Sequence, residues 1–232
     1  MTAAPIHFRS ERLMLDPAGA AYWPARRVLI VADLHFETIS PATHLRNPVA
    51  AAVDTKATLE RLNRLLRLYH PAKVIILGHN LPSFGGTSRL AKNEKVKIEA
   101  MAREANFIWV DNGAESGSCA LPGVCTDLYR EGAFTFRHRA APALGPRELE
   151  ISGFHHPRAS IEARAKRVSR PCFVADANRL MLPAFAGAEG GQDVREPAIA
   201  RLFPRGLRVF LLGQDQLYSF ALEQLGRMAE VA

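Results

Sequence analysis

The fold is decided by residues 27–35, which read RVLIVADLH. Residues 28–32 form a continuous aliphatic run, which is typical of a strand buried on both faces of a parallel sheet. The run leads directly into Asp33 and His35, two side chains of metal-binding type. Because a strand alternates faces, these two side chains are expected to point the same way. Ligands gather at the carboxyl ends of parallel strands, so the stretch predicts a buried strand with a candidate site at its end.

Two further apolar runs, residues 73–78 and 107–111, repeat this pattern along the chain. Between the first two runs, residues 59–69 carry apolar side chains at helical spacing, which predicts a helix. Residues 88–105 predict a second helix before the third run. The series strand, helix, strand, helix, strand predicts parallel strands joined by right-handed crossovers.

The second half of the chain contains shorter apolar runs, which predict strands joined by turns. Residues 124–129 and 133–138 are expected to form one hairpin closed around residues 130–132. The most economical architecture is an α/β fold with two facing mixed β-sheets and helices outside, in a single domain over residues 1–232. The other expected strands are residues 12–15, 149–152, 160–163, 172–175, 179–182, 207–212 and 216–221.

The charge balance favours acidic partners. Thirty basic and 23 acidic residues give a formal net charge of +7, which suits nucleic acid, phosphorylated substrates or anionic membrane. Residues 137–170 hold eight basic side chains against three acidic ones. The alternative interpretation of this cluster is a solvated face. The candidate phosphate- or nucleic-acid-binding residues in this segment are Arg137, Arg139, Arg158, Arg164 and Arg167.

Composition excludes several classes of protein. Apolar residues make up 48% and charged residues 23% of the 232 residues, which is ordinary for a globular protein and excludes disorder over most of the chain. No aliphatic run approaches the roughly 20 residues that a membrane span needs. The N-terminus lacks the pattern of a secretory signal, and three cysteines are too few for a disulfide framework. We therefore expect a cytoplasmic protein without a membrane partner.

Side chains that bind metals recur where the expected strands end. Any one of them is weak evidence, because a histidine at a strand end is usually just hydrogen-bonded and an Asn-Gly pair is usually a turn. The ordered set predicts that the strand ends converge on one site. Besides Asp33 and His35, the set comprises His79, Asn112, His138 and His156.

This order resembles the calcineurin-like metallophosphoesterases, whose pattern is Asp-x-His, Gly-Asp, Gly-Asn-His, His and Gly-His-x-His. More narrowly, residues 15–24, 31–37, 54–62, 170–174 and 182–185 are similar to the bacterial ligase-associated DNA damage response endonucleases. The resemblance implies a four-layer sandwich, in which helices flank two facing mixed sheets. It also implies a metal-dependent phosphodiesterase of DNA repair whose neighbours are a DNA ligase and a helicase.

The resemblance carries metal-binding roles onto this chain residue by residue. It assigns Asp33, His35 and His156 to a first metal. It assigns Asn112 and His138 to a second metal and to the catalytic machinery.

Three positions depart from the family pattern. His79 stands where the family has a bridging aspartate, Gly113 where it has a histidine beside the leaving group, and Phe154 where it has another metal-binding histidine. A histidine cannot bridge two cations as a carboxylate does, so the second metal is expected to bind poorly or not at all. Without the histidine at position 113, turnover loses acid assistance that is typically worth about 10²–10⁴-fold.

The first metal position is expected to be better preserved. Asp33, His35, His79 and His156 offer three imidazoles and one carboxylate, a set that suits zinc or manganese better than magnesium or calcium. One ion is therefore expected rather than two. His155 replaces Phe154 as a ligand only if the register of its loop shifts.

Two functions from different classes remain open. The first is a metal-dependent phosphodiesterase or endonuclease that acts on nucleic acid, DNA or RNA, or on a small phosphodiester, with a single or altered metal site. The alternative is a catalytically degenerate relative that binds nucleic acid or a protein partner without turnover, because fold does not determine function.

Overall fold

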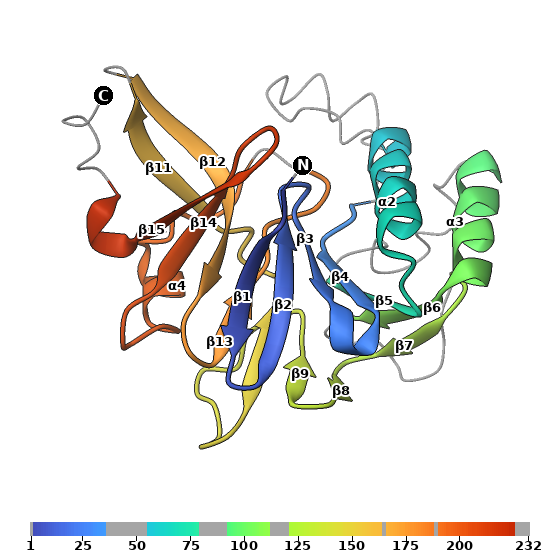
Figure 1. Ribbon diagram of the computed structural model, residues 1–232, viewed down its shortest axis with the longest axis horizontal. Helices are drawn as coiled ribbons and strands as arrows, with labels where there is room; N and C mark the ends of the chain where they lie inside the picture. The colour runs from blue at the N-terminus through green and yellow to red at the C-terminus, as the bar shows by residue number, and fades with distance from the viewer. Residues whose placement is uncertain are drawn as a thin grey trace.

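The computed structural model describes residues 2–35, 55–78, 92–111, 121–163, 166–187 and 190–225. Two mixed β-sheets face each other (Figure 1). The first sheet has the strand order β1-β2-β3-β4-β5-β6-β7, parallel from β4 to β7 and antiparallel before that. Its strands are β1 (Ala4–Phe8), β2 (Glu11–Asp16), β3 (Ala20–Trp23), β4 (Val28–Ala32), β5 (Lys73–Leu77), β6 (Asn106–Val110) and β7 (Val124–Thr126).

The second sheet has the order β15-β14-β12-β13-β10-β9-β8, and β11 pairs with β12 beside this path. Parallel pairing joins β10 to both β9 and β13, and the other pairs are antiparallel. The strands are β8 (Tyr129–Glu131), β9 (Phe134–Phe136), β10 (Leu149–Ser152), β11 (Arg158–Ala163), β12 (Lys166–Ala175), β13 (Arg179–Met181), β14 (Arg208–Leu212) and β15 (Leu217–Ala221).

Helices cover the outer faces unequally. Helices α2 (Thr55–Tyr69) and α3 (Lys92–Glu104) lie side by side against the first sheet (Figure 1). In the described part of the chain, the second sheet carries only the short helix α4 (Pro197–Ala200) and the 3₁₀ turn η3 (Leu222–Gln224). A further 3₁₀ turn, η1 (Pro24–Arg26), precedes β4. The prediction of two facing mixed sheets with outer helices is confirmed.

The alternation of side chains along β4 explains the layers. Val28, Ile30 and Ala32 pack in the central core between the sheets, whereas Leu29 and Val31 pack against α2 and α3. All five are buried, as expected for an aliphatic run with both faces covered. Strands β5 and β6 alternate in the same way, so the three parallel strands are held rigidly between two apolar layers.

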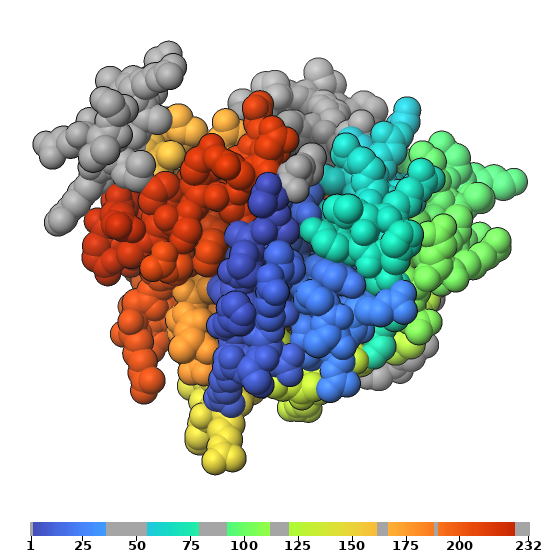
Figure 2. All heavy atoms as spheres, viewed as in Figure 1, coloured from blue at the N-terminus to red at the C-terminus, as the bar shows by residue number. Residues whose placement is uncertain are grey.

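The space-filling view shows how the antiparallel part of the first sheet closes one side of the molecule. Strands β1 to β3, in blue, lie between the second sheet in orange and red and the helices in cyan and green (Figure 2). Trp23 and Phe8 from this part both pack on Phe134 of the second sheet, with ring centroids 5.1 and 5.7 Å apart. These edge-to-face contacts join the two sheets.

One predicted hairpin is wrong. Residues 124–129 and 133–138 were expected to pair, but β7 joins the first sheet in parallel with β6, and the hairpin is formed by β8 and β9. Gly132 adopts a φ of +55° in the turn of that hairpin. A three-residue strand gives too short a pattern to reveal its partner. Strands β1 and β3, of five and four residues, were not predicted either, and β1 is an edge strand in which only Phe8 is buried.

Two further observations concern the chain as a whole. No helix among the described residues is long and apolar enough to cross a membrane. Cys172 is a buried free thiol, whereas Cys125 is disulfide-bonded, which the three-cysteine count did not predict.

Candidate metal centre

The centre begins at the carboxyl end of β4. Asp33 follows the last strand residue, is fully buried, and donates its backbone N–H to the Leu77 carbonyl at 2.9 Å. Asp33 and His35 adopt φ values of +51° and +44°, a left-handed conformation that is uncommon for residues other than glycine. The strand alternation expected to align them therefore ends at Ala32, and a strained turn brings the two side chains together instead.

His156 completes a cluster of three potential metal ligands. It lies in the loop between β10 and β11, with a φ of +45°, and its Nε2 is 3.1 Å from Asp33 Oδ2. The His35 and His156 rings meet edge to face, with centroids 5.1 Å apart. One ligand atom from each of Asp33, His35 and His156 lies within 4.8 Å of the other two. Three donors at this separation can bind one divalent cation.

The Asp33 carboxylate fits a cation. Within the described residues, its Oδ2 is buried without a hydrogen-bond partner, although His156 Nε2 is only 3.1 Å away. A buried, unsatisfied carboxylate oxygen is costly unless another group compensates it. Burial alone would raise the pKa of Asp33, but the contacts with His138 and His156 outweigh it and lower the pKa below its usual range. The carboxylate is therefore ionised, and its Oδ1 and Oδ2 face the imidazoles of His138 and His156.

His138 joins this cluster to a second carboxylate. Its Nε2 lies 3.0 Å from Asp33 Oδ1, and its Nδ1 lies 3.3 Å from Asp111 Oδ1. Burial alone would lower the pKa of His138, but the contacts with Asp111 and Asp33 raise it to about 9. Asp111 follows β6 directly, at a strand end where the sequence predicts polar side chains of metal-binding type. The resemblance assigns a role there to Asn112 and none to Asp111.

Glycines create the space that these side chains occupy. Gly78, at the end of β5, has a φ of +93°, and a Cβ there would lie less than 3.0 Å from His138 Nε2 and Asp33 Oδ1. A Cβ on Gly153 would lie 3.3 Å from Asp33 Oδ2 and collide with Ala32. Only a residue without a side chain allows the backbone to approach Asp33 this closely.

An aromatic and basic group borders the centre. Phe154 meets the His138 ring edge to face at 5.3 Å, and the Arg139 guanidinium lies 3.7 Å from the Phe154 ring centroid. His155 Nδ1 contacts Gln192 Oε1, and burial together with the charges of Arg139, His156 and His138 lowers the His155 pKa. The Phe154 N–H donates to the His138 carbonyl at 3.0 Å. In this loop the side chain of Phe154 lies against His138, and that of His155 contacts Gln192 instead. The register shift that would let His155 take the place of Phe154 is therefore not present.

The other predicted arginines lie in different surroundings. Arg137 forms ion pairs with Glu148 and Glu150. Arg158 donates to Ser169 Oγ at 3.2 Å and to the Ser169 carbonyl at 3.1 Å. Arg167 is exposed on β12. Outside the described residues lie His79, Asn112, Gly113 and Arg164.

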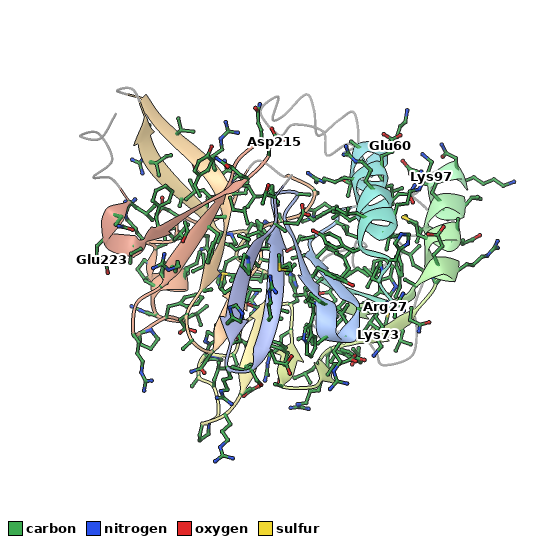
Figure 3. All side chains as sticks on the ribbon, in the orientation of Figure 1. Arg27, Glu60, Lys73, Lys97, Asp215 and Glu223 are labelled. Atoms are coloured by element: carbon green, nitrogen blue, oxygen red, sulfur yellow. The ribbon has the colours of Figure 1, made fainter. Side chains whose placement is uncertain are left out.

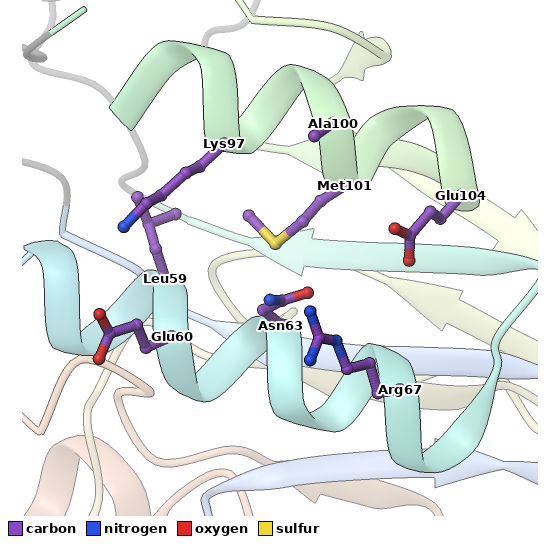
Figure 4. A pocket seen from close by; sticks show the side chains of 8 residues that line it. All are labelled: Leu59, Glu60, Asn63, Arg67, Lys97, Ala100, Met101 and Glu104. Carbon is purple, nitrogen blue, oxygen red and sulfur yellow. The ribbon is translucent and has the colours of Figure 1, made fainter. Parts of the chain in front are cut away.

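A separate hollow of about 210 Å³ lies between α2 and α3 (Figure 4). Apolar Leu59 and Met101 form part of its wall, and both belong to the apolar layer outside the first sheet. The hollow therefore lies on the other side of the sheet from the core that faces the second sheet. Its charged lining residues are Glu60, Arg67, Lys97 and Glu104.

Comparison with known proteins places this geometry in a structural family. No protein-family model and no curated protein matches the sequence. The crystal structure of Pseudomonas putida nuclease MPE matches 94% of this chain and 100% of its own, with 26% identity and a TM-score of 0.67. A Vps29 double mutant from Entamoeba histolytica matches 84% of this chain and 97% of its own, with 15% identity and a TM-score of 0.31, too low to support an argument. The chain has the calcineurin-like metallophosphoesterase fold and is similar over nearly its whole length to nuclease MPE.

Proposed function

We propose that the protein is a metal-dependent phosphodiesterase that cleaves nucleic acid or a small phosphodiester with a single ion. The observation that carries this proposal is the cluster of Asp33, His35 and His156, whose ligand atoms lie within 4.8 Å of one another. The orphaned Asp33 Oδ2 supports it, because a cation would compensate that oxygen.

Zinc or manganese is the ion we propose. Two imidazoles and a carboxylate suit these metals better than magnesium, and the ion would supply Lewis acidity toward a phosphoryl oxygen. His79 is proposed as a further ligand, because it offers an imidazole at the position where the family has a bridging aspartate.

His138 is proposed to hold a proton beside the phosphate. Both of its ring nitrogens face carboxylates, and its pKa is raised to about 9, so it carries positive charge at neutral pH. Because both ring nitrogens already face Asp33 and Asp111, His138 would act on a phosphate through its positive charge rather than through a hydrogen bond. Asn112 is proposed as its neighbour in this role.

One ion rather than two follows from the residues around His138. Phe154 offers no ligand atom, and each His138 nitrogen is directed at a carboxylate rather than at open space. Little remains among the described residues to bind a second cation there.

Nucleic acid is the substrate class that the surroundings favour. The similar protein in Pseudomonas putida is named a nuclease. His156 lies two residues before β11, so the centre adjoins the near end of the β11–β12 ribbon, where Arg170 is exposed, whereas Arg167 lies toward the far end opposite Glu162. Basic side chains beside a cleavage site bind the phosphate backbone. Arg137 is the weakest of the proposed phosphate ligands, because Glu148 and Glu150 already pair with it. A DNA ligase and a helicase as neighbours, and a cytoplasmic place in DNA repair, remain proposals from the resemblance.

Phe154 favours a second candidate function. Because an apolar ring stands where the family has a metal ligand, a nucleic-acid-binding protein without turnover is the alternative.

Metal content and hydrolysis separate the two functions. Purified protein is analysed for bound metal and assayed on an aryl phosphodiester and on single-stranded DNA with zinc or manganese added. We expect close to one ion per chain and metal-dependent hydrolysis, both lost in His35→Ala. The matched control is His7→Ala, because His7 is an exposed histidine on β1. Wild-type protein that binds no metal and hydrolyses neither substrate contradicts the proposal, and retained DNA binding would then support the alternative.

A further inference from the structure

Arg139, one of the candidate phosphate-binding residues, stacks on Phe154 at the border of the metal centre. The guanidinium carbon of Arg139 lies 3.7 Å from the centre of the Phe154 ring. The same ring meets the rings of His138 and His155, each with 5.3 Å between centroids, and His138 in turn contacts Asp33. A continuous series of contacts therefore connects an exposed cation to the candidate metal centre.

The stacked geometry leaves the Arg139 guanidinium available to an anion. In the described part of the chain, no ion pair with a carboxylate engages Arg139, in contrast to Arg137 two residues earlier. Stacking uses the flat face of a guanidinium and leaves its N–H groups directed outward along the edge. Those N–H groups match two oxygens of a phosphate. The same stacking restricts the long side chain to one place before any ligand arrives.

A single-ion centre would benefit from a second positive charge near Phe154. A single ion supplies half the positive charge of a two-metal phosphoesterase site. Phe154 replaces the histidine that would bind the second ion, and that replacement is what supports Arg139. The loss of a metal ligand and the gain of a positioned guanidinium are thus one structural feature.

We propose that Arg139, held on the face of Phe154, binds the phosphate of the substrate in place of a second metal ion. The proposal rests on the proposed function, since it concerns the same centre. Arg139 is a substrate-positioning residue that contributes positive charge without any metal ligand. Phe154 acts through Arg139.

The test compares Arg139→Gln with Arg205→Gln. Each variant removes one positive charge, and Arg205 is an exposed arginine that lines separate pockets with Asp176 and Asn178. The first measurement is the salt dependence of binding to a single-stranded DNA oligonucleotide, with EDTA present so that no metal contributes. Each lost phosphate contact reduces the slope of log K against log salt by about 0.7. We expect this reduction for Arg139→Gln and an unchanged slope for Arg205→Gln.

The second measurement uses zinc-loaded protein. Arg139→Gln is expected to keep its zinc content and to lose about 10²-fold in kcat/KM on an aryl phosphodiester, which is the size of effect seen when one preorganised donor is removed. Arg139→Lys is expected to restore the salt slope but only part of kcat/KM, because an ammonium lacks the planar fork. Phe154→Leu, which retains an apolar side chain, is expected to lose activity without losing zinc.

The two measurements separate failure of this proposal from failure of the proposed function. If wild-type protein hydrolyses nothing, the proposed function fails, and the EDTA experiment still decides whether Arg139 binds phosphate. The proposal is overturned if Arg139→Gln matches Arg205→Gln in salt slope and kcat/KM. It is also overturned if Arg139→Gln loses zinc, because Arg139 would then act on the metal site itself.

Discussion

Asp33 and Glu150 are both buried carboxylates, but their surroundings differ. Glu150 lies within β10 and has a partner for each oxygen: Arg179 contacts Oε1, and the Ala141 N–H donates to Oε2 at 2.9 Å. Asp33 lies beyond the end of β4 in a left-handed conformation, and within the described residues its Oδ2 accepts no hydrogen bond. Its neighbours are imidazoles, which can bind a metal, rather than guanidinium groups, which cannot.

The difference separates a structural charge from a functional one. Glu150 pairs with Arg137 and Arg179, which stay charged at every relevant pH, although its burial still outweighs them and raises its pKa. Its role is therefore to hold β9, β10 and β13 together. Asp33 combines backbone strain with a buried oxygen that accepts no hydrogen bond among the described residues and faces the His156 imidazole, and both are costs that a fold without a site has no reason to bear. Substitution of Glu150 is therefore expected to lower the stability of the fold and leave metal binding intact. Substitution of Asp33 is expected to abolish metal binding.

Glu150→Gln is expected to have the largest effect on stability. It leaves the Arg179 guanidinium, which is 7% exposed, without its compensating charge. Removing one partner of a buried ion pair typically costs about 3–5 kcal/mol. Urea unfolding at neutral pH measures the loss. The control is Glu148→Gln, which removes a half-buried acid that also pairs with Arg137 and is expected to cost about 1 kcal/mol or less.

The zinc content of folded Glu150→Gln sharpens the comparison, because a purely structural charge leaves the metal site intact. A loss of zinc equal to that of an Asp33 variant would show that the two carboxylates are not separate in function.

Asp33→Asn tests the other carboxylate through the metal. Zinc at 100 times its dissociation constant is expected to stabilise the wild-type fold by about 2.7 kcal/mol, and Asp33→Asn is expected to abolish that gain. Asparagine suits this position because it tolerates the left-handed backbone better than most residues. Thermal unfolding with and without zinc measures the gain. If Asp33→Asn is still stabilised by zinc, the carboxylate is not a ligand and the contrast with Glu150 disappears.

Gly78→Ala distinguishes backbone strain from crowding at the centre. Gly78 and Gly206 have φ values of +93° and +91°, but a Cβ on Gly206 meets nothing within 4 Å, whereas one on Gly78 collides with His138 and Asp33. Gly206→Ala is expected to cost about 1–2 kcal/mol from strain alone. Gly78→Ala is expected to cost about 1–3 kcal/mol more and also to lose zinc binding. Equal unfolding free energies and equal zinc content in the two variants would contradict a crowded site.

The sequence predicts the centre of the fold better than its edges. The aliphatic runs of β4, β5 and β6 are long enough to reveal strands buried on both faces. The end of β4 reveals Asp33 and His35, and the end of β10 reveals His156. The edge strand β1 buries only Phe8 and the three-residue strand β7 buries no residue, so neither shows an apolar run. Strand pairing between distant segments is set by packing that no local pattern records.

The same limit applies to the side chains around the centre. Arg137 and Arg139 are two residues apart and chemically alike in the sequence, yet one pairs with Glu148 and Glu150 while the other stacks on Phe154. Parallel pairing of β9 with β10 brings the two acids to Arg137. That pairing was not predictable, so composition alone marked both arginines as phosphate ligands. The contact between His138 and Asp33, 105 residues apart, is likewise a product of the tertiary structure.

A third charge pair, Lys73 with Glu131, gives the smallest expected effect and extends the comparison to the opposite end of β5. Arg27 and Lys73 lie at the amino ends of β4 and β5 (Figure 3), and Lys73 contacts Glu131 of the second sheet, with 29% and 14% of the side chains exposed. Burial alone would raise the pKa of Glu131, but Lys73 and Tyr129 outweigh it and lower the pKa. The stabilisation is therefore present above the unfolded pKa of about 4.5 and is lost as pH falls through the lower folded value.

Glu131→Gln is expected to lower the free energy of unfolding by about 1 kcal/mol at pH 7 and by close to nothing at pH 2, as measured by urea unfolding. A cost that stays constant with pH would mean that the contact is held by packing rather than by charge.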